Sequence, residues 1–166
     1  MKTNKRGQAW GIDLIIAFII FLMGILIFFV YSVNYSEESK ENLYSLSHDG
    51  DIIFNSILSE GYPMDWNSTN VIRIGILTNG RINETKLERF YNFSVNNYAK
   101  TKNKFNTPYD YYFNMSSKIM ISTSVIEGIG KPGINLNNLN SSNLIKITKF
   151  TIYKEKPVTA YLYVWS

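Results

Sequence analysis

Cysteine is absent from this sequence of 166 residues, and histidine occurs once, at His48. The absence of cysteine excludes disulfides, cysteine-based zinc sites and thiol nucleophiles. The single histidine excludes a histidine-rich metal cage and argues against a catalytic triad. Glycine-rich phosphate loops, His-Glu-x-x-His and Gly-x-Ser-x-Gly elbows are also missing, and the carboxylates are scattered. We therefore expect no enzymatic activity, no metal and no cofactor.

The net charge of the chain is small as well. The chain carries 17 Lys and Arg against 13 Asp and Glu, a formal net charge of +4. Three of these basic residues, Lys2, Lys5 and Arg6, precede the apolar segment described next, so a chain starting at Gln8 would carry 14 against 13, a net of +1. We expect this charge to set membrane orientation, and we predict no specific nucleic-acid binding.

One long apolar run is present, from Leu14 to Val33, and it contains no charged residue. Twenty helical residues rise about 30 Å, the thickness of the hydrocarbon layer of a bilayer. Basic residues precede the run, and Glu37, Glu38 and Glu41 follow it. The distribution predicts a single-pass segment with a cytoplasmic N-terminus and an extracytoplasmic C-terminal domain.

The residues directly before the run, from Lys5 to Asp13, read Lys-Arg-Gly-Gln-Ala-Trp-Gly-Ile-Asp. This pattern resembles the class III signal peptide of archaeal type IV pilin-like proteins. The resemblance implies that a prepilin peptidase cuts between Gly7 and Gln8, with Arg6 at the preceding position. Glycine suits a cleavage site because a protease can approach its backbone closely. In the alternative interpretation, the chain is an uncleaved anchor, and the basic residues set only its topology.

Asp13 has two interpretations that the sequence leaves open. Bacterial pilins carry an acid at the fifth residue of the mature chain, where it pairs with the N-terminal amine of a neighbouring subunit. Asp13 would be the sixth residue after cleavage, so the resemblance is displaced by one position. The alternative is an ordinary helix N-terminal acid at the lipid headgroups, favoured by the helix dipole.

The sequence predicts a leader at residues 1–7, a transmembrane helix at 8–36 and an extracytoplasmic α+β domain at 37–166. Residues 37–59 continue the helix, Gly50 permits a bend, and Gly61 and Pro63 end it. We expect the apolar stripe of this helix to pack on an antiparallel sheet, as the resemblance to pilins implies. This stripe comprises Leu43, Leu46, Ile53, Phe54, Ile57 and Leu58.

The outer domain has one further predicted helix, which Asn83 caps and whose apolar stripe is Leu87, Phe90, Tyr91, Val95 and Tyr98. Alternation predicts strands at 71–76, 109–115 and 118–125, a loop at 126–143 and a closing hairpin with arms at 144–153 and 158–165. Because the apolar parity slips in the first arm, we expect a bulge near Thr148 and Lys149 that turns Phe150 and Ile152 inward. The stretches Gly61–Trp66, Val71–Ile76 and Gly80–Phe90 also resemble archaeal pilin-like proteins.

Six Asn-x-Ser/Thr motifs occur, at Asn34, Asn67, Asn83, Asn92, Asn114 and Asn140. In an extracytoplasmic domain such motifs are candidate N-glycosylation sites. About three would arise by chance from this composition, since 19 Asn × 26 Ser and Thr / 166 ≈ 3. We expect glycans at some of Asn34, Asn67 and Asn140, which lie in predicted loops or linkers.

The resemblance implies a major or minor subunit of an archaeal type IV pilus-like surface filament with a role in adhesion. Its partners would be like subunits, the prepilin peptidase, a membrane assembly platform, a cytoplasmic ATPase and the lipid bilayer. The alternative is a membrane-anchored extracytoplasmic binding protein that is never cleaved. The sequence does not separate the two.

Overall fold

The computed structural model describes residues 5–166, with the side chains of residues 5–10, 34–41 and 137 outside the description. The first element is helix α1, Lys5–Ile57. The chain divides into two compact units, Met1–Asn42 and Leu43–Ser166, and each is described by itself. The second unit is called the outer unit below.

The outer unit is an α+β domain, as predicted. Its main sheet has the strand order β1-β2-β7-β8-β3-β6, in which only the β2–β7 pair is parallel. A separate hairpin of β4 and β5 replaces the single strand predicted at 118–125. The elements after α1 are β1 (Leu77–Thr78), β2 (Arg81–Ile82), α2 (Glu84–Asn96), α3 (Tyr98–Phe105), β3 (Asp110–Met115), β4 (Ile119–Ile121), β5 (Ser124–Ile126), β6 (Ile129–Gly130), the 3-10 turn η1 (Leu136–Asn138), β7 (Leu144–Tyr153) and β8 (Lys156–Trp165).

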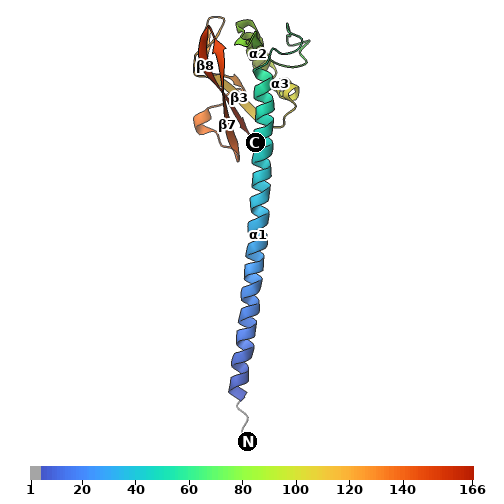
Figure 1. The fold of residues 1–166 in the computed structure, drawn as a ribbon, viewed down its shortest axis with the longest axis vertical. Coiled ribbons are helices and arrows are strands. Elements are labelled where there is room, and N and C mark those ends of the chain that lie inside the picture. Colours follow the sequence, from blue (N-terminus) through green and yellow to red (C-terminus); the bar gives the residue numbers. More distant parts are fainter. Residues whose placement is uncertain (1–4) are drawn as a thin grey trace. The chain divides into compact units, whose positions relative to one another are not determined.

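The C-terminal part of α1 packs on one face of this sheet, beside β3, β7 and β8 (Figure 1). Leu46, Ile53, Phe54 and Ile57 are fully buried, so the predicted stripe is confirmed in its central part. Gly50 is a contact point, where an added Cβ would lie 2.7 Å from Ile147 Cδ1. Helix α1 continues through Gly50 without interruption, and the missing side chain lets the sheet approach the helix closely there. The expected bend at Gly50 stays a prediction.

The predicted bulge in the closing hairpin is wrong. β7 and β8 pair without interruption from Leu144↔Trp165 to Tyr153↔Lys156. Ile145 and Ile147 therefore face the core, while Phe150 faces away from it and is 81% exposed. The turn is shorter than predicted, because only Lys154 and Glu155 separate the strands, both with positive φ. Two residues of positive φ form the tight turn that matches the twist of an antiparallel pair.

Residues 71–76 do not form the predicted strand. One isolated bridge joins Tyr62 to Arg73, and the backbone N–H of Ile76 donates to the carbonyl of Ile57 at the end of α1. The backbone of this segment therefore forms its hydrogen bonds with the end of α1 and with the preceding turn. Ile74 and Ile76 are buried, but Ile72 is 65% exposed and Val71 is buried, so the burial of this segment does not follow the apolar alternation.

Two helices stand where one was predicted. Asn83 caps α2, as expected, because its side chain accepts a hydrogen bond from the N–H of Lys86 at 3.1 Å. Asn97 then ends α2 and caps α3. Val95 is 54% exposed, contrary to the predicted stripe, because it lies beside the buried face of α2, which includes Phe93 and Ser94.

Candidate functional site

The candidate functional element of the first unit is the apolar part of α1. Gly11–Val33 is a span of 23 residues that is long and apolar enough to cross a membrane. Large apolar side chains from Ile12 to Val33 are 41% to 74% exposed, on every side of the helix. Nothing in the described chain covers them. This exposed apolar surface is compatible with a membrane anchor or a signal segment.

The predicted processing residues Arg6, Gly7 and Gln8 lie within the backbone of α1, and their side chains are outside the described residues. Asp13 is exposed near the start of the apolar span. An exposed carboxylate at this position is compatible with both of its interpretations, so pairing with an N-terminal amine stays a prediction.

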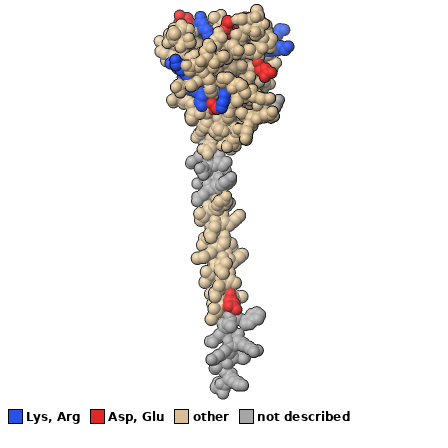
Figure 2. Space-filling view, turned by 180° about the vertical axis from the view of Figure 1, so that it is seen from behind, with Lys and Arg blue, Asp and Glu red and all other residues tan. Residues whose placement is uncertain are grey.

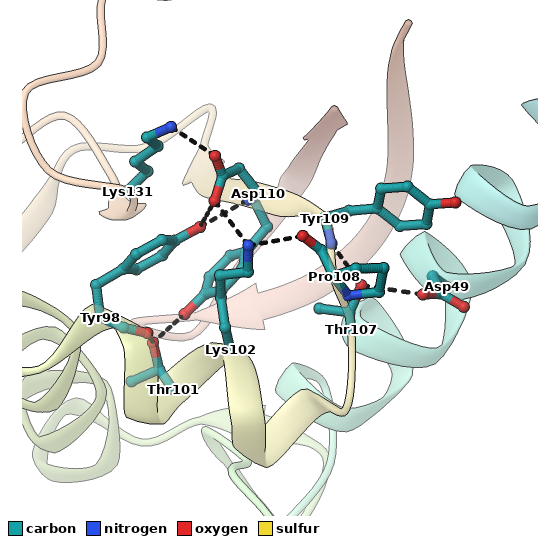
Figure 3. Close-up of polar contacts among 10 residues, drawn as sticks. Asp49, Tyr98, Thr101, Lys102, Thr107, Pro108, Tyr109, Asp110 and Lys131 are labelled. Carbon is teal, nitrogen blue, oxygen red and sulfur yellow. Dashed lines mark hydrogen bonds and ion pairs between the residues drawn. The ribbon is translucent and has the colours of Figure 1, made fainter. Parts of the chain in front are cut away.

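Polar contacts in the outer unit converge on Asp110, the first residue of β3 (Figure 3). Its Oδ2 lies 2.5 Å from Lys131 Nζ, and its Oδ1 lies 3.1 Å from Lys102 Nζ. The hydroxyl of Tyr98 donates to the same Oδ1 and accepts from the backbone N–H of Tyr111. Asp110 therefore joins α3 and the loop after β6 to β3.

A second set of hydrogen bonds extends this cluster to α1. The Thr107 hydroxyl donates to Asp49 Oδ2 at 3.0 Å and accepts from the N–H of Tyr109. On the other side, the buried Tyr111 hydroxyl donates to Thr101 Oγ1. The segment that leads from α3 into β3 is thus held at both ends.

The electrostatics of the cluster fit a structural role. Burial by itself would raise the pKa of the Asp110 carboxyl, but the two lysine ammonium groups outweigh it and lower that pKa below its usual 3.8. Burial raises the pKa of the Tyr98 and Tyr111 hydroxyls, which therefore stay protonated and remain donors. The carboxylate is neutralised by two cations, so it is poorly suited to act as a base or nucleophile.

Among the described residues, no group of three or more His, Asp or Glu side chains could hold a metal ion. On the face that Figure 2 displays, basic and acidic side chains of the outer unit occur in small separate groups. They form no continuous basic surface there, so this face offers no argument for a nucleic-acid interface.

The predicted glycosylation sites have different surroundings. Asn140 is exposed after η1, and Asn34 lies outside the described side chains. Asn67 is exposed in a tight turn, where its Oδ1 accepts from the N–H and hydroxyl of Thr69, the third residue of its own motif. Both described candidates are therefore at the surface, and their modification stays a prediction.

One buried charge was missed by the sequence analysis. Lys86, on α2, is 7% exposed, and its ammonium donates to the carbonyls of Glu60 and Leu77, both at 2.8 Å. It thereby ties α2 to the segment that follows α1. The helical period alone places Lys86 beside Leu87 and Phe90, but a lysine in such a position is usually read as solvent-exposed.

Comparison of the chain with protein-family models, curated proteins and solved structures finds no match.

Proposed function

We propose that this protein is a subunit of an archaeal type IV pilus-like surface filament. The observation that carries the proposal is the uncovered apolar span of α1, Gly11–Val33. In a precursor, lipid covers this surface. In a filament, the helices of like subunits cover it for one another, while the outer units face the surroundings. The resemblance of the flanking residues to a class III signal supplies the route between the two states.

The same helix stays partly exposed beyond the apolar span. Leu43, Tyr44 and Ile52 are 41%, 77% and 47% exposed, although they lie on the part of α1 that packs on the sheet. Tyr44 and Ile52 form an exposed apolar strip on the side of the helix away from the core, whereas Leu43 lies on the same face as the buried Leu46. A bundle of helices would bury this strip.

The proposal assigns the protein no chemistry of its own. Prepilin peptidase removes residues 1–7, and the assembly platform and ATPase extract the mature chain from the membrane. The exposed Asn67 and Asn140 are the positions at which we expect glycans, with adhesion as the role of the finished filament.

Mass spectrometry of the protein from its native membrane and from sheared surface filaments tests the proposal. We expect a mature chain that begins at Gln8. Gly7→Leu should leave the chain uncut and abolish filaments, whereas the matched variant Gly11→Leu, whose added side chain has open space, should still be cut. A native chain that retains residues 1–7 and never enters filaments would instead establish the uncleaved single-pass binding protein.

A further inference from the structure

The outer unit carries two exposed apolar surfaces that its own fold does not explain. The first is the outer sheet face, which is the side of β7 and β8 away from α1. It comprises Leu144, Lys146, Thr148, Phe150, Ile152, Thr159, Tyr161 and Tyr163. The second is the turn surface, which comprises Tyr62, Met64, Asp65 and Ile72.

The outer sheet face carries an exposed aromatic ring, that of Phe150, and a lysine ammonium group, that of Lys146. Phe150 is 81% exposed, and Leu144 at the other end of the same strand is 43% exposed. Between them, Lys146 Nζ lies 4.2 Å from the Tyr161 ring centre and 5.4 Å from that of Tyr163. In the described part of the chain, Lys146 has no carboxylate partner. Because Tyr161 pairs with Thr148, the ammonium leans along the strand toward Phe150.

The turn surface has the complementary character. Tyr62, Met64 and Ile72 are 59%, 67% and 65% exposed, and the N–H of Ile72 donates to the carbonyl of Tyr62, which holds them together. The Asp65 carboxylate has no hydrogen bond or ion pair with any described residue. Met64 and Asp65 lie at a solvent-open hollow of about 420 Å³ whose other lining residues are polar or charged, among them Glu60, Lys86 and Arg89.

The two surfaces belong to different sides of the outer unit. The outer sheet face points away from the helices that cover the other side of the sheet, whereas the turn surface adjoins α2, because Arg89 donates to the carbonyls of Asp65 and Trp66. A surface that pairs with a copy of itself closes a dimer, but two different complementary surfaces join subunits head to tail into an open array.

We propose that the outer sheet face of one subunit docks on the turn surface of the next copy of this chain. Phe150 packs against the exposed side chains of Tyr62, Met64 and Ile72, and Lys146 pairs with Asp65 of that copy. The inference rests on the proposed function, and it adds a specific lateral contact between outer units to the bundling of the apolar helices. Opposite charges and exposed apolar side chains on both surfaces favour this partner over lipid or a neutral ligand.

The absence of cysteine makes the contact directly testable. Met64→Cys and Phe150→Cys in one full-length chain, expressed in its native cell and mildly oxidised, should give a ladder of disulfide-linked multimers. Each single variant should give no ladder. The matched control pair is Val125→Cys with Met64→Cys, since Val125 is 55% exposed but lies outside both surfaces.

Charge reversal provides a second measurement. Lys146→Glu or Asp65→Lys alone should lower the yield of sheared filaments about fivefold, the effect of about 1 kcal/mol per contact. Both changes in one chain should restore the yield, because the pair is re-formed with opposite sign. Each variant is first checked for an unchanged tryptophan fluorescence spectrum.

The outcomes separate this inference from the proposed function. Filaments of chains that begin at Gln8, without a ladder and without charge rescue, overturn the docking contact and leave the filament function standing. A chain that stays uncut and monomeric in the membrane overturns both. A ladder from the double variant together with charge rescue supports both.

Discussion

Gly50 offers the sharpest test of how α1 packs on the sheet. In an isolated helix, Gly50→Ala would gain about 1 kcal/mol in helix propensity. In this protein, the new Cβ would lie 2.7 Å from Ile147 Cδ1 and 3.0 Å from Ile145 Cδ1. Carbon atoms pack best at about 3.5–4.0 Å, so both side chains must move.

The size of the effect follows from these opposing terms. Overpacking a core costs about 1–3 kcal/mol, which exceeds the gain in propensity. We therefore expect Gly50→Ala to destabilise the outer unit by about 1 kcal/mol and to lower its Tm by about 4 °C. Ile147→Val removes Cδ1 and by itself costs about 0.5–1.5 kcal/mol. In that background, Gly50→Ala should become neutral or stabilising, because the shorter of the two contacts is gone.

The assay is urea unfolding of the full chain in detergent micelles, followed by tryptophan fluorescence. Trp66 is a suitable reporter because it is fully buried and its Nε1 donates to the carbonyl of Gly75 at 2.8 Å. Ser47→Ala, at an exposed position of the same helix, measures a gain in helix propensity without a steric contact, which should be smaller than the gain from a glycine. If Gly50→Ala stabilises the protein equally with Ile147 and with Val at position 147, the close contact does not exist.

Three further predictions concern other parts of the outer unit. Asp110→Asn should destabilise it by about 1–2 kcal/mol at pH 7. The pKa of Asp110 is lowered in the folded protein, so the difference in free energy of unfolding between the two proteins is fully present above the usual pKa of 3.8. The difference is lost as the pH falls below 3.8, and urea unfolding across pH 2–7 measures it. Asn83→Ala should cost about 1 kcal/mol through loss of the cap on α2, and Asn83→Asp should restore most of it in the same assay. Phe150→Ala should change stability by less than about 0.5 kcal/mol, whereas Phe113→Ala, fully buried, should cost about 3–5 kcal/mol; equal losses would contradict the outward orientation of Phe150.

Several features follow from local sequence because their causes are local. An uncharged apolar run predicts the span of α1 by its length alone, and the run lies within one helix. Asn83 caps its helix as predicted, since a cap depends on a side chain and a backbone N–H only three residues away. Alternation likewise predicted a strand at 158–165, which lies within β8.

Other features depend on what lies across the fold from each residue. In β7 both parities carry apolar side chains, so the pattern cannot say which face meets α1; pairing with β8 decides it and leaves Phe150 outside. The backbone of residues 71–76 forms hydrogen bonds with the end of α1 and with the turn at Tyr62. These hydrogen bonds replace those that a neighbouring strand would otherwise make.

Thus the sequence by itself determined the apolar helix, its flanking charges and the α+β character of the outer domain. Only the tertiary structure decided that Gly50 is a point of contact, that Lys86 is buried against two carbonyls and that Lys102 and Lys131 meet at Asp110. The physical reason is the separation along the chain over which each interaction acts. Periodicity and capping act within a few residues, whereas steric contact and charge pairing act between segments that only the fold brings together.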